Sequence, residues 1–236
     1  MAFIDPTRTL RRSQIYRWHA SQNAVFVGRS DAVFVDHYSG SGDENKAAGR
    51  LGVCDLSLLR RDGLTGAGSN RWLLGHGYEP PQRPNTSVTQ SNGDLLVRMS
   101  AEEYLCLRLS DLGDSDRDGQ SDWAGDDNEN CYPAPRADSH CLFAVTGSSA
   151  ATLFSKLCAV DLRPHKFENG CVAQTSVARV NAIVIRHDMP QTHNFYLMAA
   201  TSAAEYLWEC LLDAMAEFGG EPIGISALRA IARPRP

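Results

Sequence analysis

The stretches LTGAGSNRWL at residues 64–73 and VTGSSAATLF at residues 145–154 carry one pattern twice. Each begins with an apolar residue and a Thr-Gly pair, continues with small residues, and ends in an apolar helical face. Glycine permits a tight turn from strand to helix, and small residues let the new helix start close to a sheet. One such junction arises by chance in any α+β protein. Two junctions with the same apolar spacing, this far apart in the chain, favour two halves of one duplicated domain.

The composition is that of an ordinary globular protein. The chain has 236 residues, of which 43% are hydrophobic and 22% charged, and a net charge of −5. This charge offers no electrostatic footprint for nucleic acid or an anionic membrane, so we expect neither as a partner. No apolar run approaches the roughly 20 residues that span a bilayer. Asp5 and Pro6 stand where a signal peptide needs apolar residues, so we expect a cytoplasmic location.

The seven cysteines form no Cys-x-x-Cys pair. Several lie within apolar runs and are typical of buried, reduced thiols in a cytoplasmic protein. Cys131, His140 and Cys141 could supply three zinc ligands, but their spacing fits no common zinc pattern.

Several segments have clear secondary-structure signals. Residues 24–27 and 32–35 predict two short strands, residues 95–99 and 104–109 predict a hairpin, and the Pro-rich residues 80–85 predict a loop. The strongest signal is a helix over residues 203–218, where apolar residues recur every three or four positions.

The ends of this last helix carry their own signals. Ser202 and Glu205 have the spacing of a capping box, in which the two side chains bind backbone N–H groups of the first turn. Gly219 and Gly220 predict a left-handed end to the helix. Trp208 and Met215 belong to the apolar stripe, and we interpret them as packing residues.

Between residues 110 and 139 apolar residues nearly disappear and aspartates become frequent, which predicts a long loop outside the core. Its alternating carboxylates, followed by glycine, match the first half of a calcium-binding loop. The predicted calcium ligands are Asp114, Asp116, Asp118, Gln120 and Asp122. Position 12, which normally supplies a bidentate acid, is Gly125. The alternative is a solvated acidic loop that binds no metal.

Longer stretches support a family resemblance. They are GVCDLSLL at 52–59, GLTG at 63–66, RPN at 83–85, FAVTG at 143–147, LCAVDLRP at 157–164, AQTSVARVN at 173–181, AEYLW at 204–208 and AEFGG at 216–220. On these residues the chain resembles the gamma subunit family of heterotetrameric sarcosine oxidase. More distantly, it is similar to the folate-binding aminomethyltransferase (glycine cleavage T protein) family.

The resemblance implies an α+β fold in which duplicated sheet-and-helix halves surround a central cavity. It divides the chain into an N-terminal extension with short strands (1–50), a first half (51–110), an Asp-rich insertion loop (111–139), a second half (140–229) and a tail (230–236). It also implies oxidative removal of an N-methyl group, with the one-carbon unit passed to tetrahydrofolate. The implied partner is a larger flavin- or haem-containing demethylase subunit.

The chain departs from the transferase pattern at two places. Full-length folate transferases carry a key acid in an Asp-Asp or Gly-x-Asp-Asp turn and a Gly-Tyr-Thr-Gly-Glu segment. Here the corresponding residues are 91–95 (SNGDL) and 180–183 (VNAI). We therefore assign no catalytic residue. No nucleophile motif, phosphate loop or dinucleotide fingerprint is present in the sequence either.

A folate needs an acid for the pterin ring, aromatic faces around it and basic groups for its glutamate tail. The residues of suitable type that we select as cofactor-binding candidates are Trp72, Tyr104, Arg179 and Tyr196. Each residue type is also common in protein cores and interfaces.

Two functions follow from these patterns. The first is a gamma-type subunit of a folate-linked oxidative N-demethylase, with a mainly structural role and an exposed docking patch on the N-terminal 50 residues or the first half. The second is a stand-alone tetrahydrofolate-dependent aminomethyltransferase or formaldehyde-capturing enzyme of methylamine catabolism. A calcium-responsive scaffold is a third option. The identity of the methylated amine and the location of folate, on this chain or on a partner, stay open at this point.

Overall fold

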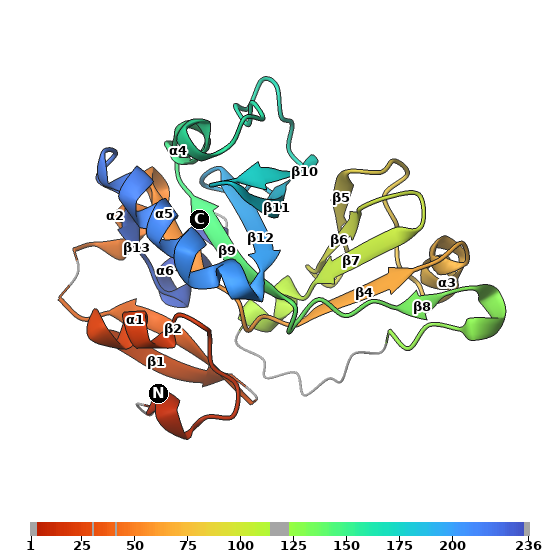
Figure 1. The fold of residues 1–236 in the computed structure, drawn as a ribbon, viewed down its shortest axis with the longest axis horizontal. Helices are drawn as coiled ribbons and strands as arrows, with labels where there is room; N and C mark the ends of the chain where they lie inside the picture. The colour runs from red at the N-terminus through yellow and green to blue at the C-terminus, as the bar shows by residue number, and fades with distance from the viewer. Residues whose placement is uncertain (1–3, 30, 41, 114–122, 234–236) are drawn as a thin grey trace.

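The repeated Thr-Gly motif forms the same strand-to-helix junction in two separate sheets (Figure 1). The computed structural model describes residues 4–29, 31–40, 42–113 and 123–233. In the first half, β4 (Arg61–Thr65) leads into α3 (Ser69–Gly75). In the second half, β9 (His140–Thr146) leads into α4 (Ala150–Leu157).

The two junction glycines have almost the same backbone conformation. Gly66 has φ +113° and Gly147 has φ +114°, a region that residues with a Cβ rarely adopt. An added Cβ at Gly66 would overlap the carbonyl oxygen of Asn130, and one at Gly147 would overlap that of Arg50. Both junctions therefore need glycine for two reasons, the positive φ and the close approach of a neighbouring chain segment.

The two sheets also have matching strand orders. The first sheet has the order β5-β6-β7-β4-β8, and the second has the order β10-β11-β12-β9-β3-β13. The remaining strands of the first sheet are β5 (Thr86–Thr89), β6 (Leu95–Arg98), β7 (Glu103–Leu107) and β8 (Tyr132–Pro133). Those of the second sheet are β10 (Val172–Val177), β11 (Val180–Arg186), β12 (Asn194–Ala200), β3 (Gly52–Asp55) and β13 (Glu221–Pro222). In sheet order, β5, β6, β7, β4 and β8 of the first sheet correspond to β10, β11, β12, β9 and β3 of the second. Among the described strands of these two sheets, only β13 has no counterpart.

The first strand of each half lies in the sheet of the other half. β3 immediately precedes β4 in the chain but pairs with β9, whereas β8 precedes β9 and pairs with β4. The two linkers therefore cross. Buried Arg61 holds the crossing together, because its Nη2 donates to the carbonyl oxygens of Ser57 (2.8 Å) and Ala137 (2.6 Å) in the two linkers.

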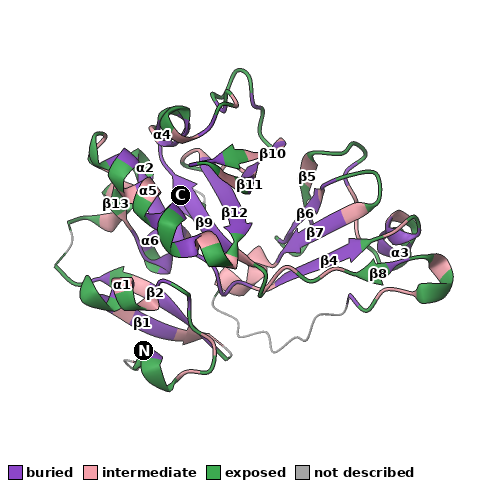
Figure 2. Ribbon diagram, in the orientation of Figure 1, coloured by how far each residue is buried: buried purple, intermediate pink, exposed green. Residues whose placement is uncertain are grey.

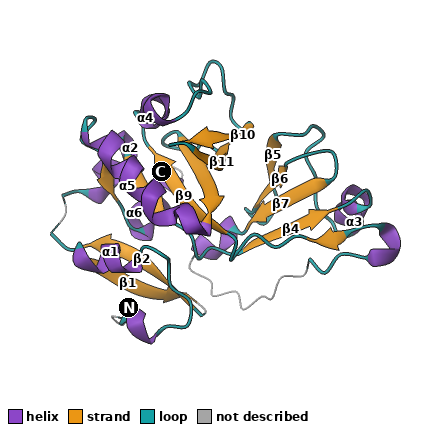
Figure 3. Cartoon of the chain, viewed as in Figure 1, coloured by secondary structure: helices purple, strands orange, loops and turns teal. Residues whose placement is uncertain are grey.

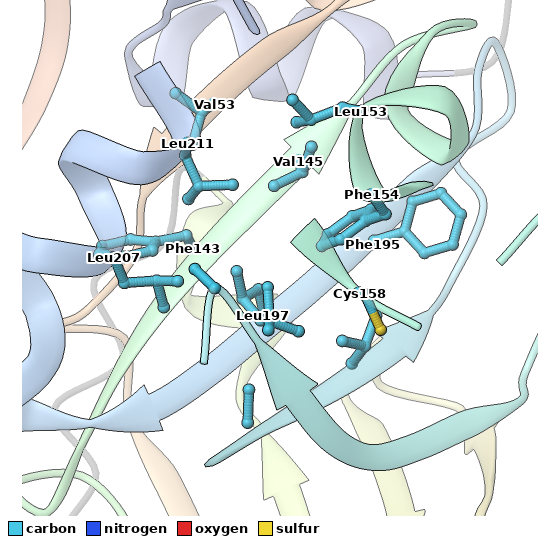
Figure 4. Packing of buried hydrophobic residues seen from close by; sticks show 14 of the residues in the cluster. Val53, Phe143, Val145, Leu153, Phe154, Cys158, Phe195, Leu197, Leu207 and Leu211 are labelled. Carbon is cyan, nitrogen blue, oxygen red and sulfur yellow. The ribbon is translucent and has the colours of Figure 1, made fainter. Parts of the chain in front are cut away.

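Apolar side chains fill three layers. α4 and α5 (Ala204–Ala216) cover the outer face of the second sheet over a large cluster that includes Phe143, Leu197 and Leu211 (Figure 4). The inner faces of both sheets share a second cluster, with Leu95 and Leu107 from the first half and Ile185 and Met198 from the second. α3 covers a smaller cluster on the outer face of the first sheet. Burial is accordingly concentrated along the central strands (Figure 2).

The N-terminal extension forms a separate antiparallel hairpin beside the second sheet (Figure 3). It contains the short helix η1 (Pro6–Arg8), α1 (Tyr16–Ser21), β1 (Ala24–Arg29), β2 (Ala32–Tyr38) and α2 (Glu44–Arg50). Near the C-terminus, α6 (Ile225–Ala232) packs against β2 and α2. The remaining short helices are η2 (Leu109–Leu112), η3 (Asp127–Glu129) and η4 (Thr201–Ala203).

Most element predictions are confirmed, including both hairpins, the helix over 204–216 and the left-handed residue after it, Gly219 (φ +59°). The capping box is wrong: η4 precedes α5, the N-cap residue is Ala203, and no side chain caps the helix. The 110–139 segment is not entirely outside the core, since Trp123 and Cys131 are buried against α3 and β7 residues.

Candidate functional site

A cleft of about 330 Å³ lies where the two halves meet beside α6. The first half contributes the β5–β6 turn and η2, and the second half contributes the β11–β12 loop and β12. Its lining residues are Gly93, Leu109, Leu112, Gly113, His187, Asp188, Met189, Pro190, Tyr196, Leu228, Arg229, Ala232 and Arg233. Its volume is at the lower end of the range for small-molecule sites, and its walls are mainly apolar.

Two nearly parallel rings are among the residues that line this cleft. The His187 and Tyr196 rings lie 6.2 Å apart with an interplanar angle of 24°. Burial lowers the pKa of His187, so its imidazole is neutral near pH 7 and can donate one hydrogen bond and accept another. Burial also raises the pKa of Tyr196, which keeps its hydroxyl protonated. The pair is therefore suited to an uncharged planar group.

The carboxylate in the cleft wall is already committed. Asp188 accepts from Arg186 Nε (3.0 Å) and Nη2 (2.5 Å), and its Oδ2 lies 3.1 Å from His193 Nδ1. Burial alone would raise the pKa of Asp188, but the hydrogen bonds from Arg186 and His193 outweigh it and hold that pKa below its usual value. Asp188 is thus an ionised structural partner of Arg186 rather than a proton donor.

A second carboxylate, Asp94, lies just before β6, in the stretch that corresponds to the transferase acid turn. It is buried, and every side-chain oxygen is occupied. Oδ1 accepts from the backbone N–H (3.1 Å) and hydroxyl (2.6 Å) of Ser110. Oδ2 accepts from Asn92 Nδ2 (2.9 Å) and Arg108 Nη1 (3.1 Å). Asp94 therefore has no lone-pair direction left for a ligand in this arrangement.

Arg108 is the centre of this network. Its Nε donates to Asp62 (2.5 Å) while Nη1 donates to Asp94 and to the Tyr78 hydroxyl (3.3 Å). Its guanidinium also lies over the rings of Tyr78 (5.9 Å) and Trp123 (5.7 Å). One arginine thus neutralises two buried carboxylates and is held between two aromatic rings, which fixes the network in place.

The four folate candidates are not brought together. Tyr196 lines the cleft. Tyr104 is buried in β7, where its hydroxyl donates to Asn70 Oδ1 (3.1 Å), and Trp72 stacks on His76 in α3 at 3.8 Å. Arg179 is exposed in the β10–β11 turn with φ +67° and lines a separate shallow groove with Tyr206.

Sequence reasoning missed the two residues that define the site's chemistry, His187 and Arg108. His187 is one of several isolated histidines, and nothing adjacent in the sequence marks it. Arg108 has a weak signal in the sequence, since it directly follows the apolar run 104–107 and Asp94 directly precedes the apolar run 95–97. Charged residues at the ends of paired strands can lie close together, and Arg108 and Asp94 do.

No three metal-ligating side chains are grouped anywhere in the part of the chain that the structure describes. Cys131, His140 and Cys141 are within that part, whereas Asp114, Asp116, Asp118, Gln120 and Asp122 lie outside it. The calcium site stays a prediction. Across residues 4–29, 31–40, 42–113 and 123–233, no helix has the length and apolarity needed to cross a membrane.

A duplicated α+β body with a cleft between its halves defines the aminomethyltransferase-like class of folate-binding folds. The family model for the GCVT N-terminal domain matches residues 90–232, more than half of the chain, and the protein belongs to this family. The aminomethyltransferase of Streptomyces avermitilis is 26% identical in an alignment over 201 residues, and the match covers 80% of this chain and 53% of the relative.

Two solved structures have the same fold. The glycine cleavage system aminomethyltransferase T from Bartonella henselae matches with a TM-score of 0.73 and 15% identity, over 95% of this chain and 62% of that one. A chain of heterotetrameric sarcosine oxidase from Corynebacterium sp. U-96, in complex with pyrrole 2-carboxylate, matches with a TM-score of 0.62 and 16% identity. This match covers 90% of the present chain and 98% of the other. The chain thus spans less than two thirds of the aminomethyltransferases that it matches, and the predicted family resemblance is confirmed.

Proposed function

We propose that this protein is a gamma-type subunit of a folate-linked oxidative N-demethylase, with a structural and assembly role. In such a complex a methylated amine loses its methyl group, and the one-carbon unit passes to tetrahydrofolate. The oxidation and the folate chemistry belong to a larger partner subunit, and we expect that subunit to carry flavin or haem.

The observation that carries this proposal is the state of Asp94. An acid that handles a proton or a ligand amine needs at least one uncommitted oxygen. The Asp94 carboxylate accepts four hydrogen bonds, one of which is its ion pair with Arg108, and Asp188 is paired with Arg186. Neither carboxylate beside the cleft is available to a pterin ring. The cleft thus fits the apolar and aromatic needs of a folate but not its need for an acid.

The match to the sarcosine oxidase chain supports the same proposal. This chain aligns with 98% of that chain, so the fold of the whole sarcosine oxidase chain has its counterpart here.

The test is purification of the tagged protein from its native host, followed by subunit analysis and an absorption spectrum. We expect a fixed stoichiometry with a larger subunit and the visible absorption of flavin or haem. Isothermal titration with tetrahydrofolate should give heat for the complex and none for the isolated chain. A purely monomeric protein with its own folate binding would contradict the proposal.

A second candidate is a stand-alone tetrahydrofolate-dependent aminomethyltransferase or formaldehyde-capturing enzyme. The observation in its favour is the cleft itself, which is mainly apolar and includes His187 and Tyr196 in its lining. This candidate predicts methylene-tetrahydrofolate formation by the isolated chain from an amine or formaldehyde. His187→Phe should abolish that activity, and His165→Phe, at an exposed histidine outside the cleft lining, is the matched control.

A further inference from the structure

The N-terminal extension has a charge opposite to that of the rest of the protein. Between Asp5 and Asp31 the sequence contains no acidic residue, and it contains five arginines within a chain of net charge −5. These arginines are Arg8, Arg11, Arg12, Arg17 and Arg29. The segment lies outside residues 90–232, which match the family model.

An apolar side chain stands in the middle of this basic segment. Leu10 is 94% exposed, the highest value among the large hydrophobic residues that are described as exposed. It lies in the extended stretch that leaves η1 and runs alongside β2, where Arg11 forms a parallel bridge with Ala32. The backbone there is fixed by hydrogen bonds from Arg11 N–H to Asp31 (3.3 Å) and from Val33 N–H to the Arg11 carbonyl (3.2 Å). Leu10 is therefore presented to solvent from an ordered backbone.

Two arginines flank one tyrosine in the residues that follow Leu10. The Arg12 guanidinium lies 4.9 Å from the centre of the Tyr16 ring and that of Arg17 lies 5.7 Å from it. Arg17 Nε donates to the Tyr16 hydroxyl (3.2 Å), and Arg12 Nη1 donates to the Thr7 carbonyl oxygen (3.3 Å). Within the described residues, neither Arg12 nor Arg17 has a carboxylate at ion-pair distance. We call Arg8, Leu10, Arg12, Tyr16 and Arg17 the N-terminal patch.

Buried contacts anchor this patch to the second sheet. His19 Nε2 lies 3.0 Å from Asp55 Oδ2 in β3, and the Tyr38 hydroxyl lies 2.7 Å from His19 Nδ1. Ser13 donates to the same Asp55 carboxylate, and Ile15 is buried in the large cluster of the second sheet. The backbone that follows Leu10 is thus held in place, which reduces the ordering entropy lost when the patch binds.

Neighbouring charges restrict what can bind here. Glu205, Glu209, Asp213 and Glu217 recur at every fourth position of α5 and its end, and Glu205 is close enough to Arg17 to favour its charged form. An extended polyanion such as RNA would meet this acidic row, and so would a flat anionic membrane. A protein surface, by contrast, can carry acidic residues only where they face the arginines, away from the acidic row of α5.

We propose that the N-terminal patch docks an acidic surface of the larger partner subunit, with Leu10 inserted into an apolar recess of that subunit. Arginine and tyrosine are the residue types that most often dominate the energy of such interfaces, and an exposed leucine provides a central apolar anchor. This inference rests on the proposed function for the identity of the partner, and it defines which face of the chain meets that partner.

The test compares four tagged proteins in the native host: wild type, Arg12→Glu/Arg17→Glu, Leu10→Ser and the control Arg71→Glu/Arg83→Glu. The control pair is exposed on the first half and changes the net charge by the same amount. We expect wild type and control to retain the larger subunit. The Arg12→Glu/Arg17→Glu protein should retain at least about tenfold less of the larger subunit than wild type, and Leu10→Ser should show a smaller reduction. All four should keep the wild-type melting temperature, because these side chains are exposed.

If all four proteins retain the larger subunit equally, the patch is not the docking face, although the proposed function survives. If wild type retains no demethylase subunit, the proposed function fails, and a second assay decides the patch. That assay measures fluorescence anisotropy of a labelled peptide of alternating Asp and Leu. Wild type and control should bind this peptide, and Arg12→Glu/Arg17→Glu or raised salt should weaken the binding at least about tenfold. This result would support an acidic protein as the ligand of the N-terminal patch.

Three other outcomes overturn the proposal. They are equal peptide binding by all variants, tighter binding to phosphatidylserine vesicles or single-stranded RNA than to the peptide, and self-association in sedimentation that is lost in Arg12→Glu/Arg17→Glu. The last outcome would make a second copy of this chain the occupant.

Discussion

The two halves share one strand order and one glycine junction, but they differ in what covers them. Two helices, α4 and α5, cover the second sheet over a large apolar cluster, whereas only α3 covers the outer face of the first sheet. The first half compensates with a polar network, because Arg108, Asp62 and Asp94 link β4, β6 and the end of β7. A duplicated backbone can thus be covered by two helices over a large apolar cluster in one copy and, in the other, by one helix together with an arginine that pairs with two buried carboxylates.

The largest expected effect comes from the junction glycines. Gly147→Val should cost about 4–6 kcal/mol, from a strained positive φ and overpacking against Arg50 and Leu51 of the core-bound segment. Gly66→Val should cost about 2–4 kcal/mol, because Asn130 lies in a surface turn that can move aside. Urea unfolding of both variants measures the difference. Equal losses would mean that the two junctions are equally constrained and would break the comparison.

Removal of the central arginine should come next. Arg108→Gln leaves the buried carboxylates of Asp62 and Asp94 without a cation and should destabilise the protein by about 3–5 kcal/mol. Arg186→Gln in the second half should cost about 1–3 kcal/mol, because Asp188 is partly exposed and is also hydrogen-bonded by His193. Thermal unfolding at pH 7 tests both changes. A larger loss for Arg186→Gln would reverse the assignment of the polar network to the first half.

The pH dependence should reveal the cleft histidine. Because burial lowers the folded-state pKa of His187, the unfolded chain binds a proton first as pH falls below about 6.5. The stability that this residue contributes is present above that pH and is lost as pH falls towards its folded-state pKa. His187→Gln should therefore reduce the stability difference between pH 7.5 and pH 5.5 by about 1 kcal/mol or less. Chemical denaturation at the two pH values measures it, and an unchanged difference would place another group in control.

The smallest effect concerns the start of α5, the helix that distinguishes the second half. Ser202→Ala should change stability by less than about 0.5 kcal/mol, because no side chain caps this helix. Asp43→Ala should cost about 1 kcal/mol, because the Asp43 carboxylate accepts from the N–H groups of Asn45 (3.1 Å) and Lys46 (3.3 Å) at the start of α2. Calorimetric melting of the two variants gives the ranking. A Ser202→Ala loss as large as that of Asp43→Ala would mean that the hydroxyl does cap α5 in solution.

The sequence was sufficient for features that depend on local patterns. The Thr-Gly repeat predicted both junctions because each junction needs a positive φ, which residues other than glycine rarely adopt. The apolar stripe predicted the helix over 204–216 because residues that recur every three or four positions lie on one face of a helix. The capping box failed because Ser202 and Glu205 have the right spacing but lie across a 3-10 turn, η4, whose geometry the spacing does not encode.

The site depends on distant contacts, which local patterns do not contain. Tyr196 was selected by residue type and does line the cleft, but Trp72, Tyr104 and Arg179 lie elsewhere. Arg108 meets Asp62 and Asp94 only because β4, β6 and β7 are neighbours in the sheet. The exchange of β3 and β8 between sheets could not be foreseen either, since the local pattern of a short strand does not encode which strand it pairs with.

That exchange has a consequence for how such a chain could arise. Two separate copies of one half, each placing its first strand in the sheet of the other, would form a domain-swapped homodimer. Joining two genes for such a dimer end to end would produce the present connectivity directly, with crossed linkers and Arg61 at the crossing. In a chain of that origin the strand exchange would date from the dimer, and the two copies would since have come to differ in the helices that cover them.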